Sequence, residues 1–150
     1  MSINKFNPVR IGVVGLGNFG RLHALTLAGL AEAELVAVVA RRQQSLDVLT
    51  EELSQVPQMQ PVPGWLNLEQ ALAESEAEAW VVASSTASHV PVTSVLLEAG
   101  FPVLLEKPLA DNLAEAQSLA PLVRPDSSNL MLGHILLFNS EFLQLVDEVR

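Results

Sequence analysis

Cysteine is absent from this 150-residue sequence, and positively charged side chains are scarce. Without cysteine, the chain has neither a disulfide framework nor a thiolate for chemistry, which is compatible with the reducing cytoplasm where we expect the protein to reside. No apolar run approaches the roughly 20 residues that a membrane span needs. The amino-terminal stretch MSINKFNPVR lacks the apolar segment of a signal peptide. We therefore expect no membrane partner.

Eight Lys and Arg residues stand against 17 Asp and Glu, so the formal net charge is −9. This charge argues against general binding to the phosphate backbone of nucleic acids. It also means that any anion site must be built locally from the few cations present. Nearly half of the residues are hydrophobic, at 49%, and 17% are charged, which is typical of a folded chain with a well-filled core.

Short apolar segments alternate with longer segments of helical spacing. The apolar segments lack the in-out alternation of a one-sided sheet, which favours strands that are covered on both faces. We predict strands over residues 9–14, 35–40, 79–84, 103–106 and 130–132, and helical segments over 22–29, 46–53, 88–99 and 113–123. The proline-rich residues 56–64 predict a loop, with a short edge strand near Val62. The alternation predicts an α/β fold with a doubly wound parallel sheet.

The first predicted strand leads directly into the sequence GLGNFG, residues 15–20. In a dinucleotide-binding turn, the first glycine makes the bend, the second lets the backbone approach a pyrophosphate, and the third lets helix and strand pack closely. A helix that begins here would offer free N–H groups to the phosphates. The predicted cofactor-binding residues of the turn are Gly15, Leu16, Gly17, Asn18, Phe19 and Gly20. The alternative is an ordinary strand–helix turn that happens to use glycines.

Two adjacent arginines follow the second predicted strand, at Arg41 and Arg42. An NAD-binding turn commonly has Asp or Glu about 20 residues past the glycines, where it binds the ribose 2′-OH. Ala40 occupies that position, so the carboxylate is missing. A 2′-phosphate needs both a site without a carboxylate and a guanidinium to bind it, and Ser45 would add a hydroxyl. We predict that NADP(H) is favoured and that NAD(H) is possible, with fully solvated arginines as the alternative.

Three further stretches, ASSTASH at 83–89, LEKP at 105–108 and GHILLFN at 133–139, follow in order. Together with GLGNFG, they resemble the glucose–fructose oxidoreductase / inositol dehydrogenase / MocA-type family of NAD(P)-dependent oxidoreductases. The resemblance implies a Rossmann NAD(P)-binding domain over residues 1–132. It also implies that residues 133–150 are the beginning of a truncated substrate domain, a second α/β domain of which only the start is present.

The resemblance implies roles for several residues of these stretches. Lys107 matches a catalytic lysine near the nicotinamide, and Glu106 matches an acid that contacts the cofactor. The other matched cofactor-lining residues are Ser84, Ser85, Thr86 and His89. The segment 84–86 departs from the usual Thr-Pro-Asn, because it keeps hydroxyls but loses the proline and the amide. The downstream Asp/His catalytic pair of the family has no counterpart, so we expect this chain alone to be incomplete for catalysis.

The residues themselves also favour a role for Lys107, one of two lysines, because it follows a predicted buried strand. Ligands of doubly wound folds collect at that edge, where a lysine would donate a proton to an alkoxide or stabilise it. The alternative is a surface ion pair with Glu106 or Asp111. The histidines are far apart in sequence and lack metal-ligand spacing, so we predict no metal. We expect His23 to be packed or at the rim of the first helix, without a special role.

These patterns predict an oxidoreductase that transfers hydride between NADP(H) and a sugar-like or other small hydroxyl or carbonyl substrate. A non-catalytic nucleotide-binding module, or a redox-sensing subunit, is the alternative. Residues 135–149, ILLFNSEFLQLVDEV, combine an apolar run with apolar residues at helical spacing. We expect this segment to make the chain a homo-oligomer, because a large apolar patch rarely stays exposed on a soluble monomer.

Overall fold

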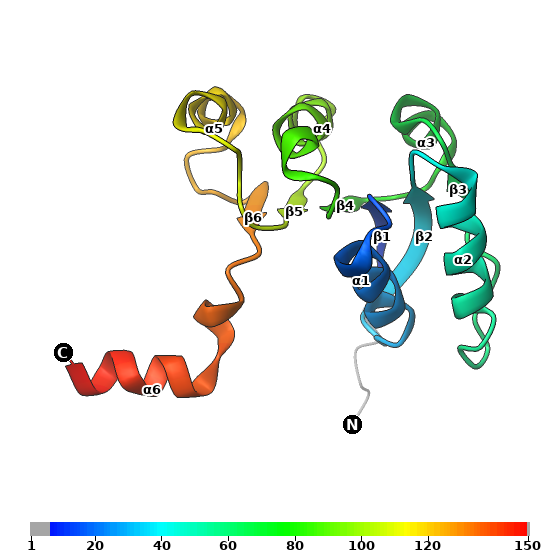
Figure 1. Ribbon diagram of the computed structural model, residues 1–150, viewed down its shortest axis with the longest axis horizontal. Helices are drawn as coiled ribbons and strands as arrows, with labels where there is room; N and C mark the ends of the chain where they lie inside the picture. Colours follow the sequence, from blue (N-terminus) through cyan, green and yellow to red (C-terminus); the bar gives the residue numbers. More distant parts are fainter. Residues whose placement is uncertain (1–6, 150) are drawn as a thin grey trace.

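The computed structural model describes residues 7–149, without the side chains of residues 136 and 149. A single sheet of six parallel strands, in the order β3-β2-β1-β4-β5-β6, forms the centre of the fold (Figure 1). The strands are β1 Val9–Val14, β2 Ala33–Val39, β3 Gly64–Trp65, β4 Ala79–Val82, β5 Val103–Leu105 and β6 Leu130–Leu132. Every neighbouring pair is parallel, which confirms the predicted doubly wound sheet.

Helices connect the strands and cover both faces of the sheet. The α-helices are α1 Asn18–Ala28, α2 Gln43–Leu53, α3 Leu68–Glu74, α4 Thr86–Glu98, α5 Leu113–Leu119 and α6 Ser140–Val149, with short 3₁₀ helices η1 Ala120–Leu122 and η2 Ile135–Phe138. In Figure 1, α1 and α2 lie on one side of the sheet, and α3, α4 and α5 lie on the other. This arrangement follows from the right-handed crossover between parallel strands.

Successive residues of each central strand enter two different hydrophobic cores. Val13 and Val81 are buried in one core with Leu27 of α1 and Leu49 of α2. The next residue on each strand, Val14 or Val82, is buried in the other core, which includes residues of α3, α4 and α5. The continuous apolar sequence of these strands is therefore explained by burial on both faces.

The boundaries of several elements differ from the predictions. The edge strand is at Gly64–Trp65 rather than near Val62, and α2 begins at Gln43, three residues before the predicted helical segment 46–53. Helix α3 was not predicted, because it is short and its one buried residue is Ala71. Helix α5 begins after Asn112, whose side chain accepts a hydrogen bond from the Glu115 N–H at 3.0 Å.

The sheet order reverses between β1 and β4, which lie side by side. Ligand sites in open α/β sheets form at the carboxyl ends of strands at such a switch point. Helices α1 and α2, which begin near this edge, are tied together by Arg21 and Glu52, with N···O distances of 2.7 and 3.1 Å. On the far side, Trp65 Nε1 donates to Glu74 at 3.0 Å, which holds β3 to α3 and lowers the pKa of that carboxyl.

The carboxyl-terminal segment leaves the sheet after β6. In Figure 1, η2 and α6 project away from the strands and from the other helices. Ile135, Leu137 and Phe138 are 70%, 58% and 67% exposed, and Leu145 of α6 is 56% exposed. Within residues 7–149, no helix has the length and apolar character required to cross a bilayer.

Candidate functional site

The glycine turn between β1 and α1 is shaped by close contacts that exclude a side chain. Gly15 has φ +91°, and a Cβ there would lie 2.6 Å from the main-chain nitrogen of Ser84. A Cβ on Gly20 would overlap the carbonyl oxygen of Gly15. The first glycine therefore permits the bend against β4, and the third permits α1 to pack on the turn, as the sequence predicted.

Gly17 differs from the other two glycines because its position is open. A Cβ on Gly17 would meet no atom within 4 Å, and the residue forms the N-cap of α1 without a side-chain hydrogen bond to the helix. The first turn of α1 contains no acidic residue. The amino-terminal N–H groups of α1 and the positive end of its dipole are therefore available to an anion.

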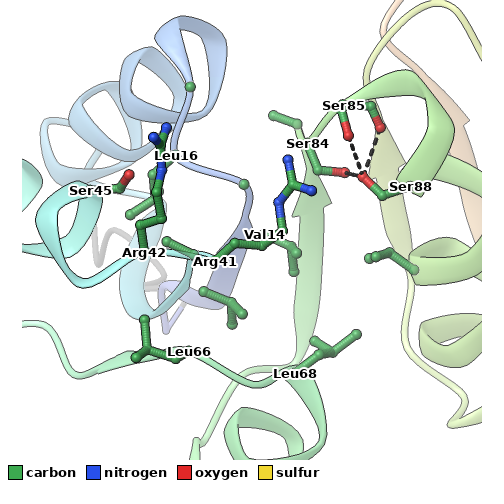
Figure 2. Close-up of a pocket in the computed structure, with 16 residues that line it drawn as sticks. Val14, Leu16, Arg41, Arg42, Ser45, Leu66, Leu68, Ser84, Ser85 and Ser88 are labelled. Atoms are coloured by element: carbon green, nitrogen blue, oxygen red, sulfur yellow. Dashed lines mark hydrogen bonds between the residues drawn. The ribbon is translucent and has the colours of Figure 1, made fainter.

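A cleft of about 780 Å³ opens above the carboxyl ends of β1, β2 and β4 (Figure 2). Its lining combines the glycine turn, the end of β2, the start of α2, the segment after β3 and the start of α4. The lining residues are Val14, Gly15, Leu16, Gly17, Val39, Ala40, Arg41, Arg42, Ser45, Leu66, Leu68, Ala83, Ser84, Ser85, Ser88 and Val92. None of these residues is acidic, although the chain as a whole has net charge −9.

Both arginines that follow β2 point into this cleft. In Figure 2, Arg42 lies on the side of Ser45, and Arg41 lies on the side of Ser84. Both side chains are exposed, and neither forms an ion pair with another of the described residues. Ala40 is 5% exposed, and its N–H donates to the carbonyl of Trp65 at 3.0 Å. Two unpaired guanidinium groups thus face a cleft that holds no carboxylate to oppose an anion.

Serine hydroxyls line the opposite wall, at the start of α4. The Ser88 Oγ lies 2.8 Å from the Ser84 Oγ and 3.0 Å from the Ser85 Oγ (Figure 2). Thr86 begins α4 but does not line the cleft. This wall offers hydroxyl donors and acceptors in the place where the resemblance predicted Ser84 and Ser85.

The segment after β5 lies beside the glycine turn and outside the cleft lining. The exposed Lys107 has its Nζ 5.5 Å from the centroid of the Phe19 ring, a cation–π arrangement. Neither Glu106 nor Asp111 forms an ion pair with Lys107 in the described residues. The Glu106 carboxylate lies 2.7 Å from His23 Nε2, so His23 has a specific partner that the sequence did not predict.

His89, in the first turn of α4, is buried and does not line the cleft. Its ring nitrogens lie 2.7 Å from the carbonyl oxygen of Pro108 and 3.0 Å from that of Ser84. The structure therefore places His89 between Ser84, which lines the cleft, and Pro108 of the segment after β5. A direct contact of His89 with a cofactor stays a prediction.

Seven lining residues were not predicted: Val14, Val39, Leu66, Leu68, Ala83, Ser88 and Val92. Val14, Val39 and Ala83 lie at or just after the carboxyl ends of β1, β2 and β4. Ser88 and Val92 follow Ser84 at intervals of four, so the helical period of α4 would have identified them as neighbours on one face. No sequence signal identifies Leu66 and Leu68, because the pairing of β3 with β2 brings them to the cleft. Among the described residues, no cluster of three His, Asp or Glu side chains has metal-binding geometry.

The family model described as "Oxidoreductase family, NAD-binding Rossmann fold" matches residues 9–134. The chain belongs to this family. This family is the glucose–fructose oxidoreductase, inositol dehydrogenase and MocA group, which the sequence motifs resemble. The glycine turn and the six-stranded sheet thus form an NAD(P)-binding oxidoreductase domain.

Known relatives of this oxidoreductase domain are longer than the chain. Myo-inositol 2-dehydrogenase of Thermotoga maritima is 29% identical over 142 residues, which cover 95% of this chain and 41% of that protein. Human biliverdin reductase A is 32% identical over 149 residues, which cover 97% and 45% of the two chains. The crystal structure of GenD2 from gentamicin A biosynthesis in complex with NAD has TM-score 0.82 and 25% identity, over 99% and 40% of the two chains. The chain thus spans less than half the length of each relative.

Proposed function

We propose that this domain binds NADP(H) in preference to NAD(H). The domain would serve hydride transfer to or from a sugar-like or other small hydroxyl or carbonyl substrate. The observation that carries the cofactor preference is the composition of the cleft. Arg41, Arg42 and Ser45 line the same cleft as Gly15 and Gly17, and no acidic residue lines it. The substrate class is supported by the Thermotoga maritima relative, whose name states myo-inositol.

The residues of the cleft fit the parts of a dinucleotide phosphate. The open face of Gly17 and the start of α1 would hold the pyrophosphate through backbone N–H groups. Arg42 and Ser45 would bind the 2′-phosphate, and Arg41 would lie over the adenine, opposite the apolar side chains of Leu66 and Leu68.

Lys107 would act at the other end of the bound dinucleotide, where the nicotinamide supplies or accepts a hydride. The lysine follows β5 at the carboxyl edge of the sheet and lies beside Phe19 of the glycine turn. Its ammonium would give a proton to the substrate oxygen during reduction, or stabilise the alkoxide during oxidation. We also propose that residues 1–132 form the cofactor domain and that residues 133–150 begin the substrate domain. The position of η2 and α6 away from the sheet supports this division.

Calorimetric titration of the chain with NADPH and NADH at one salt concentration tests the cofactor preference. A charge-assisted hydrogen bond contributes about 1.5–3 kcal/mol, and about 1.4 kcal/mol corresponds to a tenfold change in affinity. We expect NADPH to bind roughly ten- to hundredfold more tightly than NADH, and the double variant Arg41→Ala, Arg42→Ala to lose this difference.

Arg124→Ala is the matched control, because Arg124 is exposed and lies outside the cleft. It removes one positive charge and should leave the NADPH-to-NADH ratio within about twofold of wild type, since distant exposed charges are screened. Equal affinities in the wild type, or a ratio that the double variant retains, would contradict the proposed preference.

The exposed apolar side chains of η2 and α6 lead to a prediction about assembly. We expect the chain to self-associate through residues 135–149. Burial of one large apolar side chain contributes about 1.5–3 kcal/mol of favourable free energy, and pairing about a twofold axis would bury this segment of both copies at once. Sedimentation equilibrium over a concentration series measures this association. A chain ended at Gly133 is the control and should remain a monomer, and a monomeric full chain at all concentrations would rule out the prediction.

A further inference from the structure

Two histidines from different helices bond to the short segment that contains Lys107. His23 of α1 places its Nε2 2.7 Å from the Oε1 of Glu106. His89 of α4 places its Nδ1 2.7 Å from the carbonyl oxygen of Pro108. Lys107 stands between the two residues that are bonded. An imidazole ring therefore contacts the residue on each side of Lys107, and the two rings come from residues 66 positions apart in the sequence.

The Glu106 carboxylate is nearly enclosed by protein and does not line the cleft. Its side chain is 11% exposed, and the Lys107 N–H donates to its Oε2 at 3.1 Å. A Cβ on Gly133 would lie 3.3 Å from the same oxygen, so that side is closed as well. A nearly buried carboxylate requires hydrogen-bond donors. His23 and the Lys107 N–H supply them, so His23 fixes the carboxylate that in turn holds the Lys107 amide.

His89 lies between this segment and the wall of the cleft. It is 2% exposed, and its second ring nitrogen lies 3.0 Å from the carbonyl oxygen of Ser84, which lines the cleft. A neutral imidazole has one N–H and can donate to one of the two carbonyls. We assign the proton to Nδ1, because the contact with Pro108 is the shorter one.

The Lys107 side chain depends on this anchored backbone for its position. It is exposed and makes no ion pair with the described residues, and its one aromatic contact is with Phe19. We propose that His23 and His89 are positioning residues, which hold the Glu106–Pro108 backbone so that the Lys107 ammonium reaches the cofactor. This inference rests on the proposed function, because that function assigns Lys107 to the cofactor.

Replacement of each histidine by Gln and by Asn tests the proposal, because we expect Gln to be tolerated at position 23 and Asn at position 89. The longer Gln side chain can place its amide nitrogen where histidine has Nε2, and the shorter Asn side chain can place its amide nitrogen where histidine has Nδ1. His23→Gln and His89→Asn therefore keep the bonds to Glu106 and Pro108, whereas His23→Asn and His89→Gln lose them. If the substitutions acted only by damaging packing, the same amide, either Gln or Asn, would be the more disruptive one at both positions.

The first measurement is hydrogen exchange of the Lys107 amide by NMR, without cofactor, relative to the amide of Val13 in the core. We expect exchange at least fivefold faster in His23→Asn and in His89→Gln, and within twofold of wild type in His23→Gln and in His89→Asn. Unchanged exchange in all four variants, or equal exchange within each Gln/Asn pair, would overturn the positioning role. This readout does not depend on the proposed function.

The second measurement is the rate at which limiting acetic anhydride labels Lys107, with and without saturating NADPH, relative to the other lysine, Lys5. We expect NADPH to slow labelling of Lys107 at least fivefold in the wild type, in His23→Gln and in His89→Asn. In His23→Asn and His89→Gln, we expect less than twofold slowing while the Kd for NADPH stays within threefold. Full protection in these two variants would overturn the proposal. Absence of protection in a wild type that binds NADPH would overturn the role of Lys107 at the cofactor, whatever the exchange result.

Discussion

Replacement of Gly20 by alanine is expected to lower the free energy of unfolding by about 2–4 kcal/mol. An alanine inside a helix is ordinarily better than glycine by about 1 kcal/mol. At Gly20, however, the added Cβ would overlap the carbonyl oxygen of Gly15, and it would also contact the Cβ of Ala83, just after β4, at 3.6 Å. Because the obstacle is backbone, α1 would have to move away from the sheet, with Ala24 and Leu27 leaving the core.

Urea unfolding followed by the fluorescence of buried Trp80 measures this effect. Gly29→Ala, at the C-cap of the same helix, is the matched control, because a Cβ there meets its nearest atom at 3.6 Å and φ is −100°. The control should stay within about 0.5 kcal/mol of wild type. An unfolding midpoint of Gly20→Ala equal to that of the wild type would show that the turn does not need the close packing.

Most of the sheet could be predicted from the sequence because every strand except the two-residue β3 has an apolar run of its own. The strands predicted at residues 9–14 and 130–132 coincide with β1 and β6, although Arg10 interrupts the first run and Met131 in the second is 49% exposed. Their parallel order follows from the helices between them. Helix α3 could not be predicted in the same way. It is seven residues long, and its apolar stripe is limited to the buried Ala71 and the partly buried Leu68 and Leu72. The Asn67 side chain caps it by accepting a hydrogen bond from the Gln70 N–H.

The lining of the cleft was predictable only where its residues lie a short sequence distance from a strand end. The glycines and the arginines follow their strands directly, so sequence distance defines their place at the sheet edge. The His23–Glu106 bond joins residues 83 positions apart. Only the packing of α1 on the sheet brings His23 beside the segment that follows β5, and neither residue type indicates its partner. For the same reason, the burial of His89 between Ser84 and Pro108 required the fold.

Replacement of Gly17 by alanine is expected to leave the fold intact and to weaken cofactor binding. The Cβ would meet no protein atom within 4 Å, and φ is −71°, which alanine adopts without strain. Alanine is a poorer N-cap than glycine, so we expect a loss of stability of up to about 1 kcal/mol. The new methyl group would stand in the space through which a pyrophosphate approaches the N–H groups of α1. Loss of one such charge-assisted hydrogen bond weakens binding by about 1.5–3 kcal/mol, or roughly ten- to hundredfold.

The contrast between the two glycines makes this prediction specific to a ligand. Gly17 and Gly20 are three residues apart in one turn, and the same substitution adds the same methyl group at each. Titration with NADPH should show the affinity loss for Gly17→Ala, while its urea midpoint stays close to that of the wild type. If NADPH binds Gly17→Ala as tightly as the wild type, the pyrophosphate does not lie at the open face of Gly17. The cleft beside Arg41 and Arg42 would then hold its ligand by contacts other than the start of α1.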